Sequence, residues 1–287
     1  MGRRLRSLAE TGAIVRYERE SRRVKPLPLA LRAFVCALAM LAVAAPAQAL
    51  PVKFVASYLA TARGMTVGQA KLQLERSGDS YLYRSTIQAT GLAKLLFSGN
   101  ILETSSGTLN SNGLRPARYD YQRTGSGERE DKIRFAANGE ESLLHYKGTT
   151  RQAELPAEAL DPLSLHIALM NDVAAGKQRM RYLVAEPRRL KAYEVVVTGR
   201  ERIRTGSGTI DAVRVDVVGS LKLTPGQDVV LDQLDIPAAA GGVQTSFWLA
   251  PDLDYLMVRI RHVDHDEGSI GIELQGVEVL QTADTLS

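Results

Sequence analysis

The stretch TSFWLAPDLDYLMVRIRHV, residues 245–263, shows the plan on which most of the chain is built. It carries the only tryptophan, Trp248, and predicts a strand, a turn at residues 251–254 and a returning strand that begins at Tyr255. Proline followed by aspartate between two β-rich runs favours a chain reversal, because proline presets φ and aspartate bonds the nearby backbone. Along the returning strand, apolar residues and a histidine alternate with a second set that includes Arg259 and Arg261, so the two sets face opposite sides.

Most of the chain after residue 52 repeats this plan of strand, polar turn and strand. Asn112-Gly113 and Asn138-Gly139 are strong hairpin signals. Residues 91–97 (GLAKLLF) form an apolar run that is either a strand or a helical turn, and residues 221–242 read as a long loop with a short strand at 228–231. The predicted strands are 53–60, 65–76, 80–89, 101–109, 114–123, 132–136, 142–148, 180–185, 190–203, 208–218, 244–249, 257–263 and 269–280.

A single helix interrupts the strands. Asp161 is a good N-cap, Pro162 suits the first helical position, and Gly176 follows the end of a helix that runs to about residue 175. Leu163, Ile167 and Met170 would share one face of this helix. The predicted fold class is mostly β: a single antiparallel, strongly curved sheet or a partly closed β-barrel, with one helix.

The first 49 residues predict an N-terminal extension and a cleavable signal peptide, and residues 50–287 a single β-rich domain. An arginine-rich segment precedes the apolar run 27–45, and Ala47-Gln48-Ala49 is a small-residue site with cleavage expected after Ala49. A start at Val24 would give a signal of normal length, which suggests that the first 23 residues precede the true start. A retained membrane anchor is the alternative, and the well-formed cleavage site disfavours it. The expected location is the periplasm.

Removal of this leader changes the charge. The whole chain has 36 Lys and Arg against 32 Asp and Glu; residues 1–49 hold 9 and 3 of these, so the remainder has 27 against 29. The basic balance therefore belongs to the leader and gives no argument for a nucleic-acid partner. The one cysteine, Cys36, also leaves with the leader, so we expect neither thiol chemistry nor a cysteine metal site.

No pattern predicts catalysis, a cofactor or a metal. His262 and His265 lie three apart, which on a strand places them on opposite faces, where they cannot share one ion. The chain has no G-x-S-x-G, Walker or H-E-x-x-H motif. An outer-membrane barrel is disfavoured by an aromatic content of 6% and by the polar tail 281–287.

Two sets of residues are candidate binding sites. Apolar side chains of the run 91–97, together with the tryptophan, could contact an apolar ligand as a lip on the sheet, although core packing is the commoner role of such residues. Three arginines alternate along one strand face and could bind anions, or form an ordinary solvated face. The apolar set is Leu92, Leu95, Leu96, Phe97 and Trp248, and the anion-binding set is Arg200, Arg202 and Arg204.

Several short matches in order resemble an exported bacterial family, the domain of unknown function 3108 (DUF3108). Met257 departs from the pattern, where proline is expected before the strand. The resemblance covers about residues 52–280 and implies export and a β-rich fold, without catalytic residues to transfer. The matches are Phe54-x-Ala56-x-Tyr58, Val67-Gly68, Gly91-Leu92, Gly113-Leu114-x-Pro116-x-x-Tyr119, Asp161-x-Leu163-Ser164, and Trp248-Leu249-Ala250-Pro251-Asp252 before Val258-Arg259-Ile260.

These features together favour a non-catalytic periplasmic envelope protein that binds a lipid or another apolar small molecule on a concave sheet. The alternative is a scaffold that binds envelope proteins through exposed sheet edges. A hydrolase of envelope polymers with dispersed acidic residues is a third hypothesis. Peripheral contact with a membrane is compatible with the first.

Overall fold

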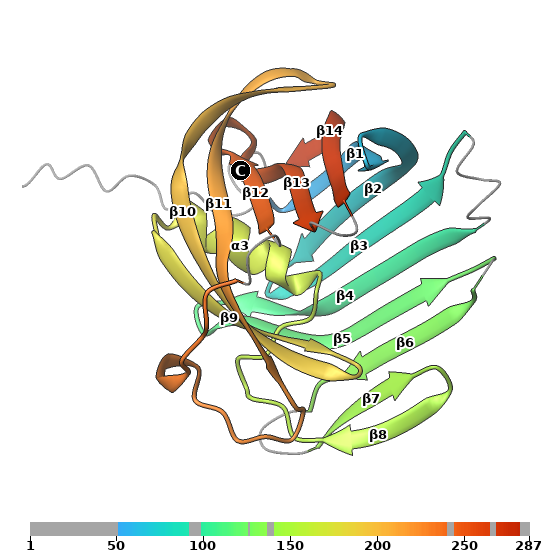
Figure 1. Cartoon of the computed structure of the whole chain (residues 1–287), viewed down its shortest axis with the longest axis vertical. Helices are drawn as coiled ribbons and strands as arrows, with labels where there is room; N and C mark the ends of the chain where they lie inside the picture. Colours follow the sequence, from blue (N-terminus) through green and yellow to red (C-terminus); the bar gives the residue numbers. More distant parts are fainter. Residues whose placement is uncertain are drawn as a thin grey trace, which may run out of the picture. The chain divides into compact units, whose positions relative to one another are not determined.

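The computed structural model describes residues 51–91, 99–125, 127–136, 141–239, 244–264 and 268–281. These residues form a 14-stranded sheet in the order β8-β7-β6-β5-β4-β3-β2-β1-β14-β13-β12-β11-β10-β9 (Figure 1), and each neighbouring pair is antiparallel. The strands are β1 (Lys53–Ala62), β2 (Met65–Ser77), β3 (Ser80–Ala89), β4 (Asn100–Asn110), β5 (Gly113–Arg123), β6 (Arg129–Arg134), β7 (Ser142–Tyr146), β8 (Thr149–Ala153), β9 (Arg179–Glu186), β10 (Arg189–Thr205), β11 (Gly208–Leu223), β12 (Gln244–Ala250), β13 (Leu256–Asp264) and β14 (Gly268–Gln281).

The first and last strands pair with each other in the middle of the sheet, with Phe54 of β1 opposite Leu280 of β14. Each half of the chain is otherwise a meander of sequential neighbours, so the two edges are β8 and β9, which both come from the centre of the sequence. The sheet is therefore open between β8 and β9, and the predicted fold class is confirmed.

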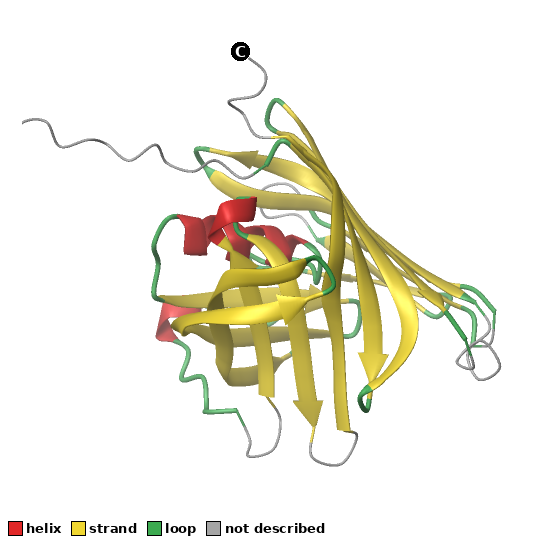
Figure 2. Ribbon diagram, turned by 90° about the horizontal axis from the view of Figure 1, so that it is seen from above, coloured by secondary structure: helices red, strands yellow, loops and turns green. Residues whose placement is uncertain are grey.

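The helix α3 (Ser164–Ala174) lies on the concave side of this sheet (Figure 2). The ring of His166 on α3 lies 6.1 Å from the ring of Tyr83 on β3 and 6.4 Å from the ring of Phe247 on β12. These strands are five places apart in the sheet, a separation of roughly 24 Å if the sheet were flat. The sheet must therefore bend around the helix.

The core fills the space between the helix and the concave face. Alternate residues of the strands point inward, as in β2, where Ala70, Leu72 and Leu74 are buried. Leu163, Ile167 and Met170, predicted to share one face of the helix, are all buried in the same core.

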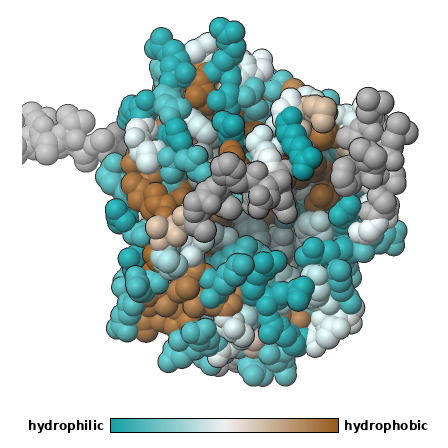
Figure 3. Space-filling view, viewed as in Figure 1, coloured by the Kyte–Doolittle hydropathy of each residue, from teal (hydrophilic) through white to brown (hydrophobic). Residues whose placement is uncertain are grey.

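Two segments cover the outer face. The strap (residues 224–239) contains the 3-10 turn η1 (Leu231–Gln233), and Arg181 of β9 donates to the strap carbonyls of Asp232 and Leu234. Tyr182, the next residue of β9, bonds Asp172 of α3, so the strap and the helix lie on opposite faces of β9. In Figure 3 apolar side chains gather at the lower left, where Figure 1 shows the strap.

The second cover is the arch (residues 199–214), the distal part of the long β10–β11 hairpin, which curves over β12–β14 in Figure 1. The backbone N–H of Gly206 at its tip donates to the carbonyl of Leu274 on β14 at 3.0 Å. The Arg259 guanidinium of β13 donates to the carbonyl of Arg204 at 2.6 Å.

Several local predictions need correction. β8 was missed, because a tight turn at Lys147-Gly148 divides one predicted strand run from a polar strand without apolar alternation. The strand predicted at 228–231 is wrong, since the segment leads into η1. The α-helix begins at Ser164, after a turn that Asp161 caps.

The predicted turn of residues 251–254 is present as the 3-10 turn η2 (Pro251–Leu253). Asp254 and Tyr255 have positive φ angles of 51° and 57°, so the returning strand begins at Leu256, between the two expected starts at residues 255 and 257. Residues 1–49 lie outside the described residues, and the predicted signal peptide stays a prediction.

Candidate functional site

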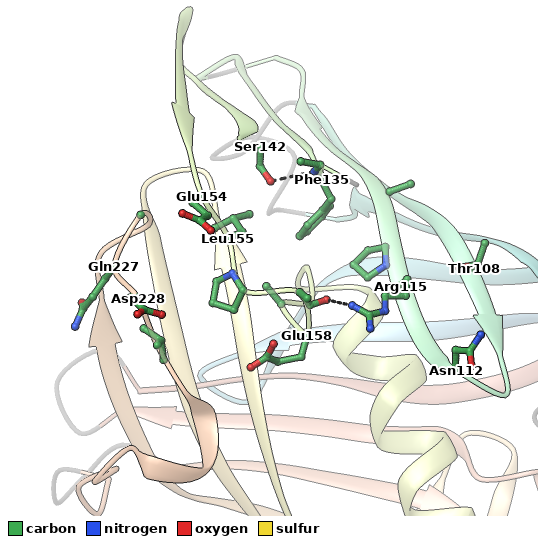
Figure 4. A pocket seen from close by; sticks show the side chains of 18 of the residues that line it. Thr108, Asn112, Arg115, Phe135, Ser142, Glu154, Leu155, Glu158, Gln227 and Asp228 are labelled. Atoms are coloured by element: carbon green, nitrogen blue, oxygen red, sulfur yellow. Dashed lines mark hydrogen bonds between the residues drawn. The ribbon is translucent and has the colours of Figure 1, made fainter. Parts of the chain in front are cut away.

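A cleft of about 1260 Å³ opens beside the gap between the two sheet edges (Figure 4). Its walls come from the ends of β4–β7, from the segment 154–159 that leaves β8, and from residues 226–229 of the strap. These segments lie far apart in the sequence, and only the curvature of the sheet brings them to one place.

Backbone hydrogen bonds hold the segment that separates the cleft from β9. Leu160 donates to the carbonyl of Leu183 at 2.8 Å and accepts from the N–H of Ala185 at 2.7 Å, so it partly covers the β9 edge. Gly226 of the strap donates to the carbonyl of Glu154 at 2.9 Å. Backbone hydrogen bonds thus tie one wall to β9 and the strap to that wall.

The cleft lining mixes apolar and charged side chains. In Figure 4 Phe135 and Leu155 lie toward one end, and Arg115 toward the other. The guanidinium of Arg115 donates to the carbonyl of Ala157 at 2.6 Å, which fixes it at the wall. The lining also includes three exposed carboxylates, which belong to Glu154, Glu158 and Asp228.

Asp161, immediately beyond the cleft wall, anchors the helix to the sheet. It is fully buried, and its carboxylate accepts from Ser105 Oγ on β4 at 2.6 Å and from the N–H groups of Leu163 and Ser164 at 2.9 Å each. Tyr81 of β3 bonds the same Ser105 hydroxyl at 3.0 Å. Burial raises the pKa of Asp161 to about 6, although these hydrogen bonds oppose the rise.

Further polar groups follow along the concave face. Tyr119 of β5 donates to Glu103 of β4 at 2.6 Å, and burial raises the pKa of Glu103 although this hydrogen bond lowers it. Two buried atoms, Asp131 Oδ1 and His166 Nδ1, have no hydrogen-bond partner among the described residues. Burial lowers the pKa of His166 to about 4, so the imidazole is neutral at pH 7.

Of the apolar residues predicted to bind a ligand, the structure describes Trp248. Leu92, Leu95, Leu96 and Phe97 lie outside the described residues. Trp248 is buried on the outer face beneath the arch, away from the cleft lining. Its indole N–H donates to Glu201 at 2.9 Å, so the indole is already part of the packing of the arch on the sheet.

The three predicted anion-binding arginines are exposed along one face of β10, as the alternation predicts, and point away from the sheet that the arch covers. Arg202 pairs with Asp211 on the neighbouring strand at 2.9 Å. For the side chains of Arg200 and Arg204 the described residues provide no acidic partner within ion-pair distance. Anion binding by this face stays a prediction.

Sequence reasoning missed the cleft. Its lining mixes charged, amide and small apolar residues from several turns, and no spacing in the sequence marks them as one site. The sequence marked only Asp161 near the cleft, and it marked that residue as a helix cap.

Within the described residues, no helix has the length and apolar character needed to cross a membrane. The same residues contain no group of three or more His, Cys, Asp or Glu side chains arranged to hold a metal ion.

Comparison with solved structures gives similar chains of low identity. A β-barrel-like protein of the DUF1849 family from Brucella abortus has a TM-score of 0.49 and 13% identity, over 80% of this chain and 98% of that one. A candidate exported protein with a YmcC-like fold from Bacteroides fragilis has a TM-score of 0.34 and 9% identity, over 80% and 96%.

Comparison with curated proteins gives no match. The model of one family, described as a protein of unknown function (DUF3108), matches residues 55–275, which is nearly the whole sheet. The chain therefore belongs to the DUF3108 family.

Proposed function

We propose that this protein is a non-catalytic, exported envelope protein that holds a lipid or another amphipathic molecule in the cleft. The cleft itself is the observation that carries the proposal. Its volume of about 1260 Å³ exceeds the roughly 300–1,000 Å³ that is usual for small-molecule sites. A long or branched ligand suits this size better than a small metabolite does.

The distribution of side chains supports an amphipathic ligand. Phe135, Leu155 and Val229 offer apolar surface, while Arg115 and the exposed carboxylates offer polar contacts. Apolar groups of the ligand gain by leaving water, and its polar groups keep hydrogen bonds with the charged side chains of the mixed lining. The leader pattern of residues 27–49 supports export to the periplasm, where envelope lipids are available.

A second candidate is a scaffold that pairs with a partner strand through β8. In β8 the first four side chains, Thr149 to Gln152, are exposed, and the strand is at one edge of the sheet. An exposed edge strand offers unpaired N–H and C=O groups for β-augmentation. The charged Arg151 on this edge argues against uncontrolled pairing, because edge charges discourage aggregation.

Native mass spectrometry of the purified protein, before and after organic extraction, tests the first proposal. We expect a bound mass that extraction removes, and rebinding of a fluorescent fatty-acid probe to the extracted protein. Ala157→Trp would place an indole in the cleft and should weaken probe binding at least tenfold. Ala238→Trp, at an exposed site outside the cleft lining, is the matched control and should bind as the wild type does.

A protein that shows no extractable mass and no probe binding would refute the proposal. Equal binding by the wild type and Ala157→Trp would show that the ligand sits elsewhere. Pull-down of an envelope protein that is lost when Thr150→Pro blocks the β8 edge would instead favour the scaffold.

A further inference from the structure

Three cations surround the ring of Tyr146 at the end of β7. The guanidinium carbons of Arg129 and Arg188 lie 5.0 Å from the ring centroid, and Nζ of Lys147 lies 5.5 Å from it. One such contact occurs about once in 70–80 residues in proteins, so three on one ring is an unusual concentration of positive charge.

The fold builds this cluster from three separate turns and strands. Arg129 begins β6, the neighbour of β7, and Lys147 occupies the tight β7–β8 turn with a positive φ of 47°, followed by Gly148 at 82°. Arg188 lies in the turn between β9 and β10, on the other side of the open edge. Arg151 of β8 donates to the carbonyl of Pro187 at 3.3 Å and holds that turn close.

The charges in the cluster are not balanced. Asp131 pairs with Arg129, and Glu186 pairs with Arg189 and Lys191 of the adjacent β10. Lys147 and Arg188 have no carboxylate within ion-pair distance among the described residues, and both are exposed. The hydrogen bond from Arg188, aided by the charges of Lys147 and Arg129, lowers the pKa of the Tyr146 phenol, a second sign of a positive local potential.

We propose that Arg188 and Lys147, oriented by the ring of Tyr146, bind a phosphate group. The planar guanidinium can donate two parallel hydrogen bonds to phosphate oxygens, and the ammonium adds a point charge. Stacking on the phenol limits the rotation of both side chains, so less conformational entropy is lost on binding. The source of the phosphate is either a lipid headgroup or free phosphate.

This site is separate from the cleft. Ser142 lines the cleft and Tyr146 lies on the same face of β7, four residues further along, a distance of roughly 13 Å. The inference therefore does not depend on the proposed cleft ligand.

The test compares two double variants with the same change in net charge. Lys147→Asn with Arg188→Ser removes the site, and asparagine tolerates the positive φ of residue 147. Arg118→Ser with Arg261→Asn removes two exposed arginines from other strands, β5 and β13, and is the control. The probes are inorganic phosphate, followed by thermal shift, and sedimentation with vesicles of phosphatidylglycerol or of uncharged diacylglycerol in phosphatidylcholine.

We expect the site variant to lose at least tenfold in apparent affinity, and the control to stay within twofold of the wild type. Binding of inorganic phosphate with little vesicle binding would identify free phosphate as the ligand. Sedimentation with phosphatidylglycerol vesicles that free phosphate displaces only weakly would identify a lipid headgroup.

The proposal is overturned if the wild type binds neither probe, or if the control loses as much affinity as the site variant. The second result would mean that net charge alone attracts anions. The fluorescent fatty-acid probe should bind both double variants as it binds the wild type, so a failure here is distinguishable from a failure of the cleft.

Discussion

Phe247 and Trp248 are neighbours on β12, yet each is buried by a different part of the chain. Phe247 points inward to His166 of α3, and Trp248 points outward to Glu201 of the arch. The inner contact joins two buried rings, and the imidazole of His166 is neutral at pH 7, whereas the outer contact involves ion pairs. Arg214 and Arg259 lie 5.4 and 5.6 Å from the Trp248 ring and pair with Glu201 and Glu273.

The exposure of these groups explains the difference. Asp161 and Ser105 on the inner side are 0% exposed, whereas the side chains of Arg214 and Glu201 are 29% and 40% exposed. A hydrogen bond between buried groups leaves a desolvated partner when it is broken, whereas water screens and replaces a partly exposed ion pair. We therefore expect the inner cover to dominate stability and the arch to contribute little.

The largest effect is expected for Asp161→Ala. The substitution leaves the Ser105 hydroxyl and the N–H groups of Leu163 and Ser164 without their acceptor in a buried place. We expect a loss of about 3–5 kcal/mol in the free energy of unfolding, measured by urea denaturation. Asp211→Ala, on the exposed arch, is the control and should unfold at the wild-type urea concentration. A loss below about 1 kcal/mol for Asp161→Ala would contradict the importance of the inner network.

A pH effect should separate Asp161 from His166. The raised pKa of Glu103 acts in the same direction as that of Asp161 and is common to the wild type and both variants, so each variant is compared with the wild type. The pKa of Asp161 is about 6 in the fold against an ordinary 3.8, so the folded state holds more protons and its stability rises as pH falls from 6 to 4. The pKa of His166 is about 4 against 6.5, so the unfolded state holds more protons and stability falls over the same range. Each contribution is about 3 kcal/mol, and in the wild type they oppose each other.

Single variants should reveal each slope relative to the wild type. His166→Phe removes the contribution of His166, which lowers stability as the pH falls. In this variant the free energy of unfolding, relative to the wild type, should therefore increase as pH falls from 6 to 4. Asp161→Asn removes the contribution of Asp161, which raises stability as the pH falls. In this variant the free energy of unfolding, relative to the wild type, should decrease as pH falls from 6.5 to 4. Urea denaturation at several pH values measures both, and parallel curves for the two variants would contradict the assignment.

A smaller effect is expected at the outer contact. Trp248→Phe loses the 2.9 Å hydrogen bond to Glu201 and part of the attraction to the two arginines, so we expect the free energy of unfolding in urea to fall by about 1–2 kcal/mol.

The fluorescence of the single tryptophan also reports on the packing of the arch. Arg259→Ala removes the bond to the Arg204 carbonyl, and we expect acrylamide to quench the fluorescence more strongly while the fold persists. Unchanged quenching would show that the arch is held by other contacts.

The smallest effect is expected for Arg202→Ala. Its ion pair with Asp211 is exposed on both sides, so we expect no measurable change in Tm at physiological salt. A clear drop in Tm would mean that the arch contributes more than its exposure suggests.

Much of the fold follows from local signals. The alternation in residues 65–76 correctly separates a wet face from a buried one, because the side-chain period of a strand is a property of the backbone. Asp161 and Gly176 mark the helix because capping satisfies backbone groups within a few residues. β8 escaped because its first four residues are polar and exposed, so no apolar pattern marks it.

The candidate site was not predictable in the same way. The sequence singles out Trp248 as the only tryptophan, but it does not show which face of the sheet buries it. That depends on the arch, a hairpin that folds back across three strands and contacts Trp248 through Glu201. The cleft and the cations around Tyr146 depend on how the curved sheet places its two unpaired edges, residues 149–153 and 179–186.

The sequence by itself determined the strands, their alternation, the single helix and the resemblance to the DUF3108 family, because these depend on short-range backbone preferences and on the order of motifs. The pairing of β1 with β14, the curvature around α3, the arch, the cleft and the cluster of cations around Tyr146 are seen only in the tertiary structure. These depend on contacts between residues far apart in the chain, such as Ser57 with Glu278 at 2.7 Å, which no local pattern encodes. The curvature of the sheet results from small twists between neighbouring strands that accumulate over many strands. Side chains from distant segments therefore come together only in the fully formed sheet.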